Sequence, residues 1–143
     1  WKMVRKNGVL RDKNGNIKEE RTEKNLVVTA GLTYIASRMK DATATAMTHM
    51  GLGSGTTDVA ANQTDLVTLL GSREALDSTA ASSNTIAYVA SFEAGDATGA
   101  VTEAGIFNAA SGATMLCRVK FNVVNKAADD TMAVTWTITL SAS

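Results

Sequence analysis

The chain has 143 residues, about the length of one domain. Its 14 Lys and Arg balance 14 Asp and Glu, which excludes a strongly basic nucleic-acid-binding protein and a disordered polyelectrolyte as classes. One Cys and one His exclude a disulfide framework within the chain, a multi-cysteine metal site and a His-rich zinc site. The abundance of Ala, Thr, Ser and Gly, together with the lack of Pro, is typical of a β-rich extracellular or particle-bound protein.

The sequence contains no targeting signal that we recognise. The N-terminal residues include no apolar run of signal-peptide length, and no stretch approaches the roughly 20 apolar residues that span a membrane. We therefore expect a soluble protein with no membrane partner. If it acts outside a cell, something other than a signal peptide carries it there.

Charge divides the chain into two parts. Residues 1–24 hold eight basic and four acidic residues, a net of +4, and the remainder holds six basic and ten acidic residues, a net of −4. Asn14-Gly15 separates two extended segments, and this dipeptide tolerates the positive φ values that tight hairpins need. A second pair, Asn7-Gly8, predicts a bulge. We predict a basic β-hairpin arm over 1–24, attached to a single domain over 25–143.

The arm is a candidate for contact between subunits. A lone two-stranded hairpin is only marginally stable in water, so we expect it to need the body or another chain as partner. Complementary charge on neighbouring subunits would orient such a contact. The alternative is a solvated hairpin without a partner. The predicted apolar centre comprises Val4, Val9, Leu10 and Ile17, and the predicted charged rim comprises Lys2, Arg5, Lys6, Arg11, Lys13 and Lys18.

The next segment predicts the one helix, near 29–40. Leu32, Ile35, Ala36 and Met39 recur at helical spacing and predict its buried face. Thr29 is the expected N-cap, and basic residues near 40 suit the C-terminal end. A helix this short depends on packing for its stability.

The rest of the chain predicts short strands joined by turns of small residues. The clearest strand is 131–140, where apolar residues alternate with Thr, a residue that favours strands because it is branched at Cβ. We predict further extended segments at 48–53, 73–78, 84–93, 101–108 and 114–121. Residues 65–70 are predicted to form a helical turn. The fold class is therefore mainly β: an antiparallel β-sandwich with one short α-helix and an N-terminal β-hairpin arm.

The search for catalytic residues finds no convincing constellation. The glycine-rich stretch 51–55 lacks the Lys-Ser/Thr ending of a phosphate-binding loop. Cys117 falls on the inward face of a predicted strand, which favours a buried, inert thiol. His49 has no second ligand nearby, and the acidic residues are too sparse for a calcium loop. We predict no enzyme activity, no cofactor and no metal.

Two features of the body call for a structural explanation. Arg73 and Glu103 each stand among small or apolar residues, and a carboxylate buried alone is costly. We therefore predict a structural ion pair between Arg73 and Glu103 that joins two strands. Gly105 lies inside a predicted strand, where glycine marks a bulge or a close backbone contact.

Several motifs, in their order along the chain, resemble small virion proteins of tailed bacteriophages. The order of the motifs is similar to that in tail-fibre and tail-collar attachment domains. The similarity spans roughly 47–140, and the preceding segment 24–39 also resembles such proteins. The motifs are Gly51-Leu52-Gly53-Ser54-Gly55-Thr56-Thr57, Leu66 to Leu70 with Arg73, Thr102-Glu103-Ala104-Gly105-Ile106-Phe107-Asn108, Met115-Leu116-Cys117-Arg118, and Val134-Thr135-Trp136-Thr137-Ile138.

The resemblance implies a non-enzymatic structural role in a virion. The first hypothesis is a capsid decoration (cement) protein that binds the major capsid protein or other virion proteins. Such a protein would be a trimer in the virion, assembled in the host cytoplasm. No shaft or receptor-binding tip follows the last predicted strand, which favours a coat component over a fibre. The alternatives are a tail, baseplate or tail-fibre attachment component and, from another class, a carbohydrate-binding sandwich. No nucleic-acid partner is expected.

Overall fold

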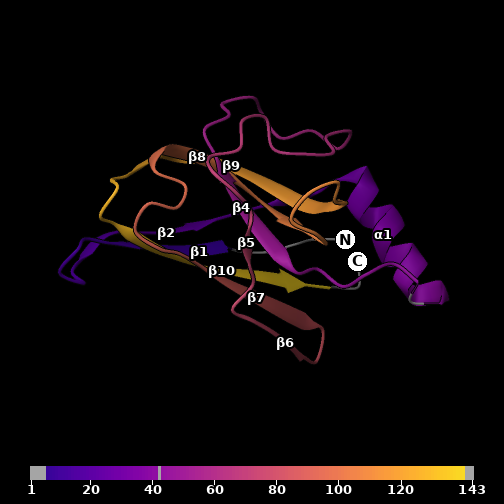
Figure 1. Cartoon of the computed structure of the whole chain (residues 1–143). Coiled ribbons are helices and arrows are strands. Elements are labelled where there is room, and N and C mark those ends of the chain that lie inside the picture. Colours follow the sequence, from indigo (N-terminus) through magenta and orange to yellow (C-terminus); the bar gives the residue numbers. More distant parts are fainter. Residues whose placement is uncertain (1–5, 42, 141–143) are drawn as a thin grey trace.

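Two antiparallel sheets of five strands each stack in a sandwich, with one helix at one end (Figure 1). This computed structural model describes residues 6–41 and 43–140. Sheet A has the order β2-β1-β10-β7-β6, and sheet B has the order β3-β9-β8-β4-β5. The elements are β1 (Lys6–Arg11), β2 (Ile17–Glu23), β3 (Leu26–Val27), α1 (Thr29–Lys40), β4 (His49–Gly53), β5 (Glu74–Ala75), β6 (Ser78–Ser82), β7 (Thr85–Phe92), β8 (Gly99–Phe107), β9 (Met115–Lys126) and β10 (Thr131–Thr139).

The predicted mainly β sandwich with one helix is confirmed, and its core follows from strand alternation. In β10 every second residue is buried, and the intervening residues, four Thr and Ala133, face outward. The buried residues of β7 pair with those of β10, for example Tyr88 with Trp136 and Ala90 with Val134. Because neighbouring pairs in register share a face, these two strands form one apolar layer against sheet B. Within the described residues, no helix is long and apolar enough to cross a membrane.

Helix α1 has the predicted bounds, but only part of its predicted face is buried. Gly31 is its buried residue and Ile35 packs against the core as predicted, whereas Leu32 is 44% exposed and Met39 is 78% exposed. A Cβ at Gly31 would collide with the Leu116 carbonyl of β9, so the missing side chain lets the helix backbone lie directly on the sheet. The predicted cap is also wrong: Val28 precedes the first turn without a side-chain cap, and Thr29 is already helical.

Three local predictions need correction. Residues 65–70 form no helical turn; they follow an irregular path with bends and a single bridge from Leu69 to Gly53. The turn at Asn14-Gly15 is confirmed, with Gly15 at φ +82°, but the irregularity in β1 falls at Leu10/Arg11 and not at Asn7-Gly8. The strand β6 was not predicted, because its five residues show no apolar alternation.

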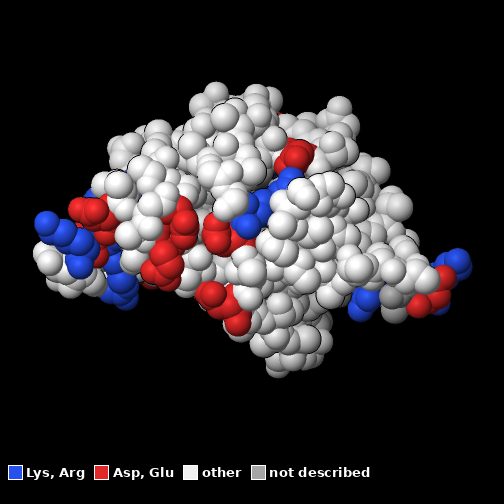
Figure 2. All heavy atoms as spheres, viewed as in Figure 1, with Lys and Arg blue, Asp and Glu red and all other residues white. Residues whose placement is uncertain are grey.

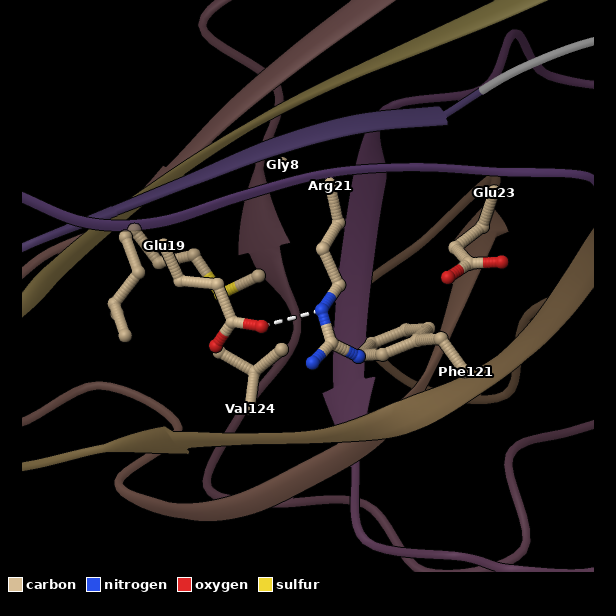
Figure 3. A pocket seen from close by; sticks show the side chains of 8 residues that line it. Gly8, Glu19, Arg21, Glu23, Phe121 and Val124 are labelled. Atoms are coloured by element: carbon tan, nitrogen blue, oxygen red, sulfur yellow. Dashed lines mark ion pairs between the residues drawn. The ribbon is translucent and has the colours of Figure 1, made fainter.

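The N-terminal hairpin is built into sheet A. β1 lies between β2 and β10, and Leu10 is buried in the main core. β2 closes the sandwich edge: Arg21 reaches from β2 to the Asn122 carbonyl of β9 at 2.6 Å and lies beside Phe121, paired with Glu19 (Figure 3). The cavity left there measures only about 10 Å³. The predicted boundary at residue 24 therefore separates no independent arm from the body.

We predict that Leu10→Ala destabilises the whole domain. Removing a buried Leu side chain costs about 2–5 kcal/mol of unfolding free energy, because the cavity is only partly refilled. Val9→Ala is the matched control, since Val9 points to the opposite, outer face of the same strand and should change the unfolding free energy far less. Chemical denaturation measures the free energy of unfolding of both variants. Equal effects would contradict the placement of Leu10 in the core.

Deleting residues 1–24 extends the same test to the whole hairpin. The deletion removes β1 and β2 and exposes the edge of β10, so we expect the truncated chain to lose its cooperative thermal transition. A sharp transition in the truncated chain would instead support an independent arm.

Candidate functional site

The outer face of sheet B, the face turned away from sheet A, carries a track of glycines. Gly51, Gly53 and Gly55 follow one another at every second residue of β4 and its extension. A Cβ at Gly53 would lie 2.5 Å from the Thr68 carbonyl oxygen. The missing side chains therefore let residues 54–73, which we call the covering segment, lie directly on this sheet. In Figure 1 it forms the loops above β4 and β8.

The carboxylate of Glu103 holds the covering segment in place. Glu103, on β8, is fully buried and accepts hydrogen bonds from the backbone N–H groups of Gly55 at 2.9 Å, Val67 at 3.1 Å and Thr68 at 2.8 Å. Backbone N–H groups of a glycine-rich loop can bind an external anion. Here the protein's own carboxylate occupies that position.

Arg118, on β9, is the cationic partner of Glu103. Its Nε lies 2.7 Å from Glu103 Oε2, and both side chains are fully buried. The two remaining guanidinium nitrogens donate to Gln63 Oε1 and to the Thr57 carbonyl, each at 3.0 Å. A buried ion pair is tolerated when its remaining polar atoms are also satisfied. The pair thus connects β8, β9 and both halves of the covering segment.

The predicted ion pair between Arg73 and Glu103 is wrong. Arg73 instead pairs with Asp65 at 2.8 Å, and its guanidinium lies 3.9 Å from the centre of the Phe107 ring. Strand register explains the difference, because Arg118 pairs with Gly105, two residues from Glu103 on the same face. The close contact predicted at Gly105 is confirmed: a Cβ there would lie 3.0 Å from the Phe107 ring.

The residues predicted to form an inter-subunit centre do not share one surface. Leu10 is in the core, Val9 lies half-buried on the outer face of sheet A, and Ile17 is 55% exposed. Arg11 and Lys13 are exposed, and Arg11 donates to the Gly15 carbonyl. The predictions for Lys2, Val4, Arg5 and the Lys6 side chain lie outside the described residues.

Lys18, also predicted on the charged rim, forms an ion pair within the chain. Its Nζ lies 2.5 Å from Asp130 Oδ2, at the turn between β9 and β10. Asp130 also accepts a hydrogen bond from the Ala127 N–H. These contacts lower the pKa of Asp130, chiefly through Lys18 and secondly through Ala127. The basic side chain thus stabilises a neighbouring hairpin.

The single cysteine and histidine occupy structural positions. Cys117 is fully buried, and burial raises the pKa of its thiol well above the usual value, so the reactive thiolate is disfavoured. His49 Nδ1 lies 2.8 Å from the Thr48 hydroxyl. Among residues 6–41 and 43–140, no three His, Cys, Asp or Glu side chains gather as a metal site would require.

The outer face of sheet A is uncharged over three neighbouring strands. Its outward positions on β10, β7 and β6 are in register, for example Thr137 beside Ala87 and Ala87 beside Ala80. Small neutral side chains occupy every one of these positions. We call this surface the neutral face: Thr131, Ala133, Thr135, Thr137, Thr139, Thr85, Ala87, Val89, Ser91, Ser78, Ala80 and Ser82.

Charge is concentrated away from this region. In the view of Figure 2, Lys, Arg, Asp and Glu gather at the hairpin end on the left, in the middle of the face and at the tip of α1 on the right, whereas the lowest part of the molecule, the region of β6, is white below a small acidic group. The strand β6 contains only Ser, Thr and Ala. Sheet A is therefore charged along β2 and neutral along β6.

An apolar groove opens on the inner side of the same sheet, where α1 incompletely covers it. Its volume is about 370 Å³. Burial raises the pKa of Tyr88, which lines it, to about 12. We call it the α1 groove; Ile35, Met39, Ala81, Ile86, Ile138 and Leu140 contribute to its walls.

The chain was compared with protein-family models, with curated proteins and with solved structures, and none of the three comparisons gives a match.

We predict that Arg118→Met is far more destabilising than Arg73→Met. The first change leaves the Glu103 carboxylate buried without its cation, which costs roughly 3–5 kcal/mol. Arg73 is the matched control: its own side chain is only 6% exposed, but its partner Asp65 is 57% exposed and stays in contact with water when the cation is removed, so we expect a smaller loss. Chemical denaturation gives the free energies, and limited proteolysis reports release of the covering segment. Similar losses in the two variants would contradict the central role of Glu103.

We also predict a contribution of Asp130 to acid sensitivity. A carboxyl whose pKa is lowered by folding stabilises the fold above its unfolded pKa of about 3.9, and this stabilisation is lost as the pH falls through the folded value. Lys18→Met removes the largest cause of the lowered pKa. The variant should melt at a lower temperature than the parent near neutral pH, and the difference should shrink towards about pH 2. A difference that does not depend on pH would contradict this assignment.

Proposed function

We propose that this protein is a non-enzymatic virion structural protein, and specifically a capsid decoration protein that binds the major capsid lattice of a tailed bacteriophage. The proposal combines the resemblance of the motifs with one structural observation, the neutral face of sheet A. The partner would be the capsid surface, and the location would be the virion.

The neutral face supports this proposal because of what a lattice contact requires. Such an interface excludes water over a broad area, and any charge buried in it without a partner opposes binding. Small Thr, Ala, Ser and Val side chains on a sheet give a surface without long side chains that lose conformational freedom on binding. Repetition over a lattice would multiply a modest contact at each site.

The covering segment supports a permanent structural role rather than a moving site. Glu103 and Arg118 fix it from beneath, and Lys120 adds an ion pair with Asp58 at 2.7 Å. Its N-terminal half also reaches α1, where the Thr29 N–H donates to the Ala61 carbonyl at 2.7 Å. These contacts hold the segment against sheet B, on the side of the sandwich opposite the neutral face.

The described surface supports the two alternative functions, tail attachment and carbohydrate binding, to different degrees. A tail or fibre-attachment role would use the same neutral face, so it stays the second candidate. A carbohydrate-binding sandwich needs exposed aromatic rings, and of the described aromatic side chains only Tyr34 is not buried, and it is half-buried. The neutral face thus favours a protein partner.

The experiment mixes the full chain with capsids purified without it and, separately, with purified tails of the same phage. We expect sedimenting capsids to retain the protein and tails not to. Thr137→Lys places a charge in the neutral face and should weaken capsid binding about tenfold or more. Thr64→Lys, an equivalent change at an exposed residue of the covering segment, is the matched control and should bind as the parent does.

Each other outcome contradicts part of the proposal. Binding to tails alone would support the attachment role instead. Binding to capsids that Thr137→Lys leaves unchanged would exclude the neutral face as the contact. Retention on neither particle would exclude both virion roles.

A further inference from the structure

The two edges of sheet A differ in how they resist pairing with another strand. β2 carries Lys18, Glu19, Glu20, Arg21 and Glu23, and charged residues of this kind protect an edge from another chain. β6 is the opposite edge, and all five of its residues are exposed and neutral. It contains neither charge nor Pro. β6 is therefore the unprotected edge of sheet A.

The backbone of β6 is oriented for strand addition. β6 and β7 are joined by a two-residue turn, Ser83-Asn84, with Ser82 paired to Thr85. Residues that flank a two-residue hairpin exchange both backbone hydrogen bonds, and positions alternate along an antiparallel ladder. Thr79 and Ala81 therefore direct their N–H and C=O groups to the open edge.

We propose that β6 pairs antiparallel with β6 of a second copy of this chain, around a two-fold axis at Ala80. In this register Thr79 faces Ala81 of the second copy, and each such pair exchanges both backbone hydrogen bonds. Ser78 faces Ser82, and the two Ala80 side chains meet on the axis. Every facing pair is small and neutral, so neither charge nor bulk opposes the contact.

Charge favours β6 of the second copy over its other edge. Pairing β6 with β2 of a second copy would set the charged residues of β2 beside a strand that offers no opposite charge. The β6–β6 contact is isologous, as two-fold interfaces are, and it closes at two subunits. It therefore gives a dimer in place of the trimer that the resemblance implies.

A stable dimer would have to bury the surfaces that adjoin β6 as well as the strand itself. A strand of five residues is too small for the roughly 800 Å² per subunit of a standard interface. The α1 groove runs along the inner side of β6, and Met39 at its rim is 78% exposed. An axis perpendicular to the sheet brings both grooves, whose walls include Arg38 as well as Met39, to the same side of the joined sheet.

The dimer joins two copies of sheet A into one sheet, and the two neutral faces become continuous. This proposal is independent of capsid binding, because it is tested on the protein alone. Thr137→Lys, which tests the proposed function, lies away from the β6 edge and should leave the dimer intact.

The test measures the molar mass of the full chain by sedimentation velocity from about 1 µM to about 1 mM. We expect a monomer–dimer equilibrium. Ala81→Pro removes an N–H that faces the open edge, a position where a strand tolerates Pro, and should weaken the dimer at least about tenfold. Circular dichroism checks that the variant is folded.

A pair of charge variants tests the axis itself and does not depend on Pro. Ala80→Glu and Ala80→Lys each place like charges opposite each other on the axis, so each alone should be mostly monomeric, with the loss reduced by salt. Mixed in equal amounts, they should form a mixed dimer. A wild-type chain that stays monomeric throughout, a trimer, or a mixture that fails to pair would each overturn the proposal, and the first would point to a strand of another protein as the occupant of β6.

Discussion

The buried carboxylate of Glu103 is the interaction on which the architecture of this protein depends. A charge at that depth persists only when it is paired and hydrogen-bonded, and here Arg118 and three backbone N–H groups satisfy it. Three of these four donors, the N–H groups of Gly55, Val67 and Thr68, belong to the covering segment. The requirements of one carboxylate therefore fix a long irregular segment that has little regular secondary structure of its own.

Glycines, which have no side chain, also allow other segments to pack closely on sheet B. Gly53 and Gly55 admit the covering segment, and Gly31 admits α1 against β9. A second apolar cluster of Val28, Leu66, Phe107 and Met115 then fills the space beneath them. Among the residues that the structure describes, sheet B is consequently covered on both faces, whereas sheet A is covered on its inner face only. This asymmetry leaves the neutral face as an open surface, and it is the physical basis of the functional proposals.

Sequence reasoning predicted the features that arise from local periodicity. Alternation located β7 and β10 and the buried residues of both, and helical spacing located α1 between the correct residues. It failed where the position of a side chain depends on a contact with a residue distant in sequence. The buried face of α1 follows from its approach to Leu116, and the partner of Glu103 follows from the register of β8 and β9. One signal was available: Arg118 is the lone charged residue within Met115–Val119, a run of otherwise apolar residues.

The charge split along the chain also has a structural explanation that differs from the predicted one. Lys18 pairs with Asp130, and Arg21 bonds to Glu19 and to the carbonyl of Asn122, so these basic groups are used within the subunit. Their effect is to close one side of the sandwich and to make its β2 edge unsuitable for another strand. Because the β2 edge is closed by charge, the neutral β6 edge and the neutral face remain for contacts between molecules. In the proposed dimer, the asymmetry of charge would direct association by excluding one edge, and packing of small neutral residues would supply the attraction at the other.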